Sequence, residues 1–208
     1  MKKVVLLITV LLISVISTAC INNLAVQELN NKAKEYMANG ETEKAICRLR
    51  SSIDLDDSIF ETHYNLGVAL LTDEEYKDAQ TSLENAIKLK PDFADSYYSL
   101  ALAFENQAGE IINGESDKDK AKDEDSEKKD NEKPKKLTDS EKHQIVELYN
   151  SAIDNYNKYL SKNSKAQDKE KITSQIDYLN TQISKYNSAS NSSMDDLTNI
   201  SPSTAGEE

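Results

Sequence analysis

Few side chains in this sequence could do enzymatic chemistry. It has two histidines, His63 and His143, and two cysteines, Cys20 and Cys47. No HExxH, GxSxG or phosphate-binding Gly-rich loop occurs, so no zinc protease, serine hydrolase or nucleotide site is indicated. We therefore predict no enzyme, no cofactor and no metal site. We expect His63 to pack inside, His143 to be solvated and Cys47 to act as a small buried hydrophobe.

The charged run Glu115–Lys136 holds the remaining candidates for metal chemistry. An EF-hand calcium loop needs Gly at its sixth position and Glu at its twelfth. A loop starting at Asp117 has Lys122 and Lys128 there, so calcium binding is not predicted. The run also has too little apolar surface to offset the entropy of ordering. We expect a disordered insertion over about residues 113–138.

The first twenty residues differ from the rest. Lys2 and Lys3 precede an apolar run, Val4 to Ile16, which is shorter than the roughly 20 residues of a spanning helix. This layout is typical of a secretory signal. The four residues that follow the apolar run, Ser17-Thr18-Ala19-Cys20, resemble the lipobox of bacterial lipoproteins, although Ser17 stands where Leu is usual. An ordinary secretory signal with an incidental cysteine is the alternative.

The lipobox resemblance implies a lipid-anchored protein. It implies a signal peptide over residues 1–19, palmitate-type acyl chains on Cys20 and a short tether over residues 20–25. The protein would then lie outside the cytoplasmic membrane, on the outer membrane if the organism has one. The formal net charge of −12 repels nucleic acid and anionic lipid headgroups. Attachment to the membrane would therefore depend on the acyl chains, and no nucleic-acid partner is expected.

A repeat of 34 residues runs through the middle of the chain. In the unit that starts at Phe60, small and apolar residues stand at fixed positions, namely Leu66, Gly67, Leu70, Ala79, Leu83, Ala86 and Pro91. One period earlier the unit starts at Val26, and one period later it starts at Ala94. This pattern resembles the tetratricopeptide repeat (TPR), which implies two antiparallel helices, A and B, per unit.

The resemblance implies an all-α fold, a short TPR solenoid of about three repeats. The units cover residues 26–59, 60–93 and 94–162, with the charged insertion splitting the third. Helices approach closely only where side chains are small, so we expect six residues to lie at helix contacts: Ala33, Gly67, Ala79, Ala86, Ala101 and Ala152. Capping boxes are predicted at Thr72–Glu75 and Thr138–Glu141.

The third unit and the C-terminus complete the predicted array. Helices are expected near Ser96–Ile112 and Asp139–Ser161. A capping helix over residues 163–186 follows, because an apolar stripe recurs there at helical spacing: Ile172, Ile176, Leu179, Ile183 and Tyr186. The Ser- and Asn-rich residues 187–208 are expected to form a disordered tail.

The family resemblance also implies a groove lined by the A helices. The groove residues would be Asn30, Lys34, Tyr64, Asn65, Val68, Tyr98, Ser99 and Leu102. Some family members clamp a C-terminal carboxylate with paired Lys, Arg and Asn; here only Asn65 stands in place, and Asp95 and Ser99 depart from that pattern. Together the two resemblances imply a lipid-anchored scaffold of the bacterial cell envelope that binds a partner protein or peptide in this groove, with a role in assembly as one option. An envelope hydrolase or metal-binding accessory and a structural spacer are the alternatives.

Overall fold

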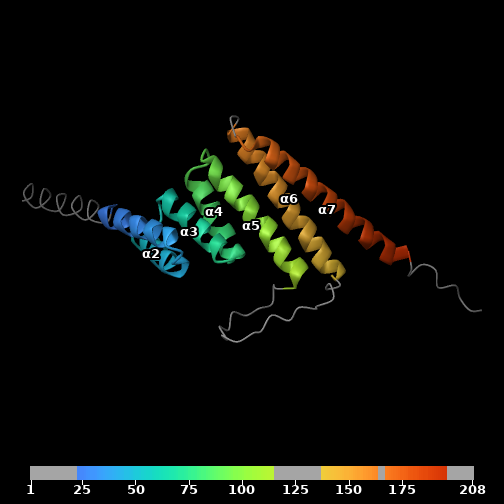
Figure 1. The fold of residues 1–208 in the computed structure, drawn as a ribbon, viewed down its shortest axis with the longest axis horizontal. Helices are drawn as coiled ribbons and strands as arrows, with labels where there is room; N and C mark the ends of the chain where they lie inside the picture. The colour runs from blue at the N-terminus through green and yellow to red at the C-terminus, as the bar shows by residue number, and fades with distance from the viewer. Residues whose placement is uncertain (1–22, 115–136, 164–166, 196–208) are drawn as a thin grey trace, which may run out of the picture. The chain divides into compact units, whose positions relative to one another are not determined.

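The computed structural model describes residues 23–114, 137–163 and 167–195, with side chains described as far as residue 188. Within these ranges all regular structure is helical, which confirms the all-α prediction (Figure 1). The chain divides into two compact units, residues 1–103 and 104–208. The predicted signal peptide with Cys20, residues 115–136 of the insertion and residues 196–208 of the tail lie outside the described residues.

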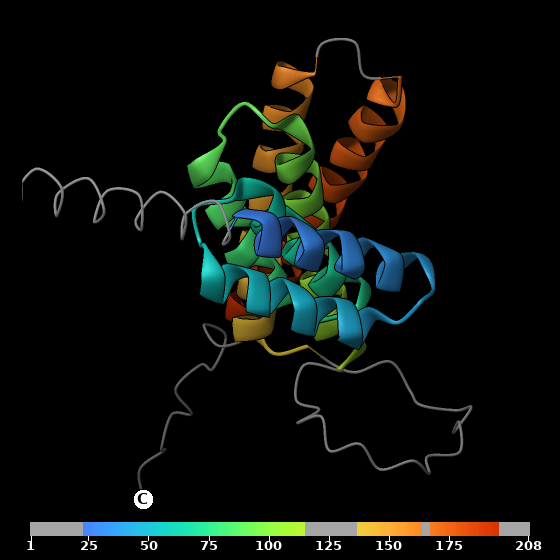
Figure 2. The ribbon, with the colours of Figure 1, turned by 90° about the vertical axis from the view of Figure 1, so that its left-hand side faces the viewer.

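The first unit is built from helical hairpins. A helix over residues 23–38 runs antiparallel to α2, Thr42–Leu55 (Figure 2). The next hairpin consists of α3, Phe60–Thr72, and α4, Tyr76–Leu89. The next helix, α5, Ala94–Asn113, has its first half in this unit. These are the A and B helices that the repeat pattern predicts.

Each hairpin of the first unit turns at a residue with a left-handed backbone. Gly40 has φ +74°, and the N–H of Glu41 donates to the Tyr36 carbonyl at 2.9 Å. One period later Glu74 has φ +61°, and the N–H of Glu75 donates to the Leu70 carbonyl at 2.8 Å. Both are Schellman-type helix ends. Glycine adopts this conformation freely, whereas it costs an L-residue such as Glu74 about 1 kcal/mol.

The capping box predicted at Thr72–Glu75 is wrong. Thr72 still belongs to the last turn of α3, and its hydroxyl donates to the Val68 carbonyl at 3.0 Å. No side chain caps the start of α4. The box predicted at Thr138–Glu141 does form: the Glu141 N–H donates to Thr138 Oγ1 at 3.2 Å, and the Thr138 N–H donates to Glu141 Oε2 at 2.7 Å.

The six small residues expected at helix contacts are all buried. Gly67 marks the tightest approach, between α3 and α4. A Cβ atom added to it would lie 2.5 Å from Leu83 Cγ and 3.3 Å from the Ala79 carbonyl oxygen. Since real Cβ atoms do not approach other heavy atoms so closely, the separation of the two helices depends on glycine at this position.

The second unit joins the end of α5 to a long hairpin. This hairpin consists of α6, Asp139–Lys162, and α7, Lys169–Asp195, which pack against each other. Glu105 of α5 links the three helices, because its carboxylate accepts hydrogen bonds from Tyr156 Oη at 2.8 Å and from Gln175 Nε2. Ile172 and Leu179 of the predicted stripe are buried in this unit.

Two predicted boundaries need correction. Helix α7 begins at Lys169 and continues through residues 187–195, where a disordered tail was expected. Those residues contain neither Pro nor Gly, so no strong helix breaker ends α7 before them. At the other end, residues 23–25 of the expected tether are already helical, and Gln27 Nε2 donates to Asn23 Oδ1 at 2.8 Å.

Candidate partner-binding groove

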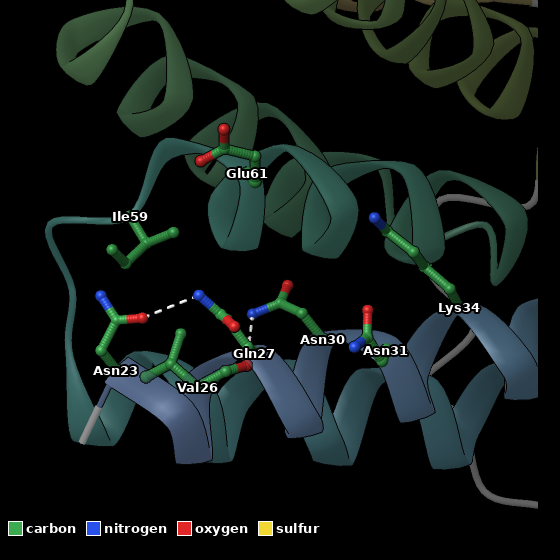
Figure 3. A pocket seen from close by; sticks show the side chains of 8 residues that line it. All are labelled: Asn23, Val26, Gln27, Asn30, Asn31, Lys34, Ile59 and Glu61. Atoms are coloured by element: carbon green, nitrogen blue, oxygen red, sulfur yellow. Dashed lines mark hydrogen bonds between the residues drawn. The ribbon is translucent and has the colours of Figure 1, made fainter. Parts of the chain in front are cut away.

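A hollow of about 390 Å³ lies between the helix of residues 23–38 and the start of α3 (Figure 3). We call it the N-terminal hollow. Four carboxamides, a lysine, a glutamate and two aliphatic side chains line it: Asn23, Gln27, Asn30, Asn31, Lys34, Glu61, Val26 and Ile59. Amide side chains both donate and accept hydrogen bonds, so the hollow can bond to the N–H and carbonyl groups of a peptide.

Asn30 is fixed in place by contacts with two other helices. Its amide nitrogen lies 3.0 Å from the Val26 carbonyl oxygen and 2.9 Å from both Ser52 Oγ and Thr62 Oγ1. All three polar side chains are buried. Asn30, predicted as a groove residue, therefore lines the hollow and also joins the first repeat to α3. Buried polar groups that keep their hydrogen bonds specify one arrangement of the helices around them.

The next repeat junction uses different chemistry at the same positions. One period after Asn30, Ser52 and Thr62 stand Tyr64, Ala86 and Ser96. Ser96 is fully buried, and its hydroxyl has no hydrogen-bond partner among the described residues. An unsatisfied buried hydroxyl costs about 1–3 kcal/mol.

Tyr64 instead joins an aromatic cluster. Its ring lies edge-on to Phe93, with ring centroids 5.0 Å apart, and Phe60 lies 5.3 Å from Phe93. Burial raises the pKa of the Tyr64 hydroxyl; a hydrogen bond with Ser99 acts in the opposite sense, and the nearby Asp95 carboxylate raises the pKa further. The hydroxyl is therefore protonated at neutral pH.

The structure brings two pairs of the predicted groove residues together. Asn65 Nδ2 donates to Asn30 Oδ1 over a long 3.4 Å, and one period later Ser99 bonds the Tyr64 hydroxyl. Both pairs join position 5 of one repeat to position 6 of the next. Of the remaining predicted groove residues, Lys34 is exposed. Three are half-buried: Val68, Tyr98 and Leu102.

Several lining residues of the hollow were missed by the sequence analysis. Gln27, Asn31 and Glu61 occupy positions 2, 6 and 2 of their repeats, so the repeat frame contains the signal that finds them. Asn23 and Ile59 precede their repeats, and only the folded path of the chain brings them to the hollow.

Each of the two histidines places a ring nitrogen against a nearby backbone carbonyl oxygen. His63 is buried, with Nε2 2.7 Å from the Asp57 carbonyl oxygen, and exposed His143 places Nδ1 2.7 Å from the Asp139 carbonyl oxygen. Within residues 23–114, 137–163 and 167–195 no cluster of three His, Cys, Asp or Glu residues could hold a metal. Cys47 is exposed rather than buried, because α2 turns Ala45, Ile46 and Leu49 inward.

Comparisons with known proteins identify the repeat. Residues 74–107 match the family model described as TPR repeat. The first TPR of Spaghetti (RPAP3), bound to the HSP90 peptide SRMEEVD, superposes with a TM-score of 0.53 at 12% identity over 77% of this chain and 94% of that one. The first TPR domain of human RPAP3 superposes with a TM-score of 0.52 at 12% identity, over 78% and 95%. A search of curated proteins finds no match.

The chain therefore carries a tetratricopeptide repeat, and its fold is that of TPR domains. This confirms, over residues 74–107, the repeat that the 34-residue pattern indicates. None of the helices described here is both long enough and apolar enough to span a bilayer.

The contrast between the two repeat junctions gives a stability prediction. Ser96→Ala should raise the free energy of unfolding by about 1–3 kcal/mol, because it removes a buried hydroxyl without a partner. Ser51→Ala, at an exposed site of α2, should add only the helix-propensity gain of about 0.5 kcal/mol. Urea unfolding followed by circular dichroism measures both. Equal gains in the two variants would show that the Ser96 hydroxyl carries no penalty.

Proposed function

We propose that this protein is a scaffold that captures an extended segment of a partner protein in the groove of its A helices. The observation that carries the proposal is the N-terminal hollow, because Gln27, Asn30, Asn31, Lys34 and Glu61 reach it from repeat positions 2, 5, 6 and 9. These are the positions that line the groove in the family. The hollow lies within the first unit and needs nothing from the second.

The chemistry of the groove suits an extended peptide. Carboxamides at the N-terminal hollow can bond to peptide N–H and carbonyl groups. Half-buried Tyr98, Val68 and Leu102 offer apolar surface along the same face. The TPR of Spaghetti (RPAP3) with its bound HSP90 peptide supports peptide capture by analogy of fold alone. Asp95 and Ser99 argue against the carboxylate clamp seen in some members of the family.

The second part of the proposal concerns location. We propose that acyl chains on Cys20 hold the protein on the outer face of a bacterial membrane. The support is the sequence of the first twenty residues, with its basic start, short apolar run and Ser-Thr-Ala-Cys exit. Because residue 23 is already helical, the chain from Cys20 spans at most about 10 Å at roughly 3.5 Å per residue. The groove would then capture partners at the membrane surface.

Site-specific photo-crosslinking in living cells tests capture. A photoreactive amino acid at Lys34, which lines the hollow, should give discrete crosslinked bands. The same amino acid at Glu84, on the exposed side of α4, should not. Crosslinked products are separated by electrophoresis and the attached peptides sequenced by mass spectrometry. Crosslinks of equal yield at both sites, or at neither, would favour a structural spacer over a scaffold.

Metabolic labelling with an alkyne-tagged fatty acid tests the anchor. The wild-type protein should take up the label and sediment with membranes, and Cys20→Ala should do neither. Cys47→Ala is the matched control, because it removes the chain's other cysteine, and it should behave as the wild type. Labelling that survives in Cys20→Ala would refute lipid attachment at this residue.

A further inference from the structure

The orientation of the Asn30 carboxamide decides which groups the N-terminal hollow offers. A carbonyl oxygen can only accept a hydrogen bond, so the amide nitrogen of Asn30 must face the Val26 carbonyl, 3.0 Å away. Ser52 and Thr62 hold the same nitrogen from α2 and α3. The Asn30 oxygen therefore points away from the Val26 carbonyl (Figure 3), where Asn65 Nδ2 of α3 donates to it.

The Asn30 oxygen has capacity left for a ligand. Within the described part of the chain its hydrogen bond comes from Asn65 at 3.4 Å, longer than the usual 2.7–3.2 Å. A carboxamide oxygen accepts two hydrogen bonds. Since its nitrogen is taken up by three acceptors, Asn30 presents the hollow with an acceptor and no spare donor.

Two carboxylates stand at repeat position 2 of successive A helices, Glu61 and Asp95. Glu61 lines the hollow and is exposed, and no other described residue forms an ion pair with it. Asp95, at the same position of the next repeat, is also exposed and acts electrostatically on Tyr64. Both carboxylates lie in the first turn of their helices, where the positive end of the helix dipole also stabilises them.

The charge of the unit favours a cationic ligand. Residues 23–103 contain eight Lys and Arg residues against fifteen Asp and Glu residues. Such an excess attracts cations and repels anions over distances of about a Debye length. Lys34 is the one cation among the residues that line the hollow.

We infer that the N-terminal hollow receives a lysine or arginine side chain of the partner segment. Glu61 balances its charge, and the Asn30 oxygen accepts one of its N–H groups. This inference rests on the proposed function and names the chemistry of its partner: a basic segment. An acidic tail of the SRMEEVD kind, as bound by Spaghetti (RPAP3), would instead meet the carboxylates of Glu61 and Asp95.

Selection from a displayed library of random peptides tests the inference without knowledge of the natural partner. The full chain in a mild detergent is the bait, at about physiological salt. Glu61→Gln is compared with Glu84→Gln, which removes the same charge from an exposed site on α4. Wild type and Glu84→Gln should enrich Lys and Arg, and Glu61→Gln should lose that enrichment. Fluorescence anisotropy with a selected peptide should show binding weakened about tenfold by Glu61→Gln and less than twofold by Glu84→Gln.

The other outcomes separate this inference from the proposed function. Enrichment of Asp and Glu that disappears in Lys34→Gln would overturn the basic partner but keep a peptide-binding groove. If Glu61→Gln and Glu84→Gln lose the Lys and Arg enrichment equally, the inferred basic partner is also overturned, because the net charge alone would then explain the attraction. No enrichment above that obtained with heat-denatured protein would overturn both.

Discussion

The close approach of α3 and α4 at Gly67 is the constraint on which the first unit depends. There is no room for a Cβ atom between Gly67 and Leu83. With glycine at that point, Leu83 packs into the space beside α3, and Ala79 and Ala86 are fully buried on the same side of α4. Ala33 stands at the same position one period earlier and is also buried. A small residue at this position suits the close spacing of a hairpin in the first unit.

The groove is a consequence of that spacing. When each A helix lies close to its own B helix, equivalent positions of successive A helices come to one face. The contacts Asn30 to Asn65 and Tyr64 to Ser99 repeat this geometry with different side chains. The first junction has a hydrogen-bonded polar group at its centre, and the second has aromatic rings and an orphan hydroxyl. The scaffold is thus periodic, while the surface chemistry is specific to each repeat.

The sequence predicts most of this fold, because the residues that recur every 34 positions are the ones that pack the helices together. The two helices expected near Ser96–Ile112 and Asp139–Ser161 form within two residues of those limits at each end. The capping box at Thr138 forms because it needs only four neighbouring residues. The one at Thr72 fails because a competing helix ending, closed through Glu74, uses the same residues.

The site was harder to predict for a physical reason. The repeat frame predicts Asn30 as a groove residue, but its amide nitrogen is held by Ser52 and Thr62, which come from two other helices. The hollow also needs Ile59, which stands in a turn outside the helical part of the repeat frame. Spacing along one helix shows which face a residue occupies, whereas hydrogen bonds across helices decide what that face can offer a ligand.

Whether a glycine-to-alanine change raises or lowers the free energy of unfolding tests the role of close helix packing at Gly67 most directly. In a helix interior this change normally stabilises by about 1 kcal/mol. Gly109 of α5 has open space where a Cβ would stand, so Gly109→Ala should raise the urea midpoint of unfolding. Gly67→Ala should lower the free energy of unfolding by about 1–3 kcal/mol, because overpacking outweighs the propensity gain. If both variants raise the midpoint, then close packing at Gly67 does not hold the hairpin together and the account is contradicted.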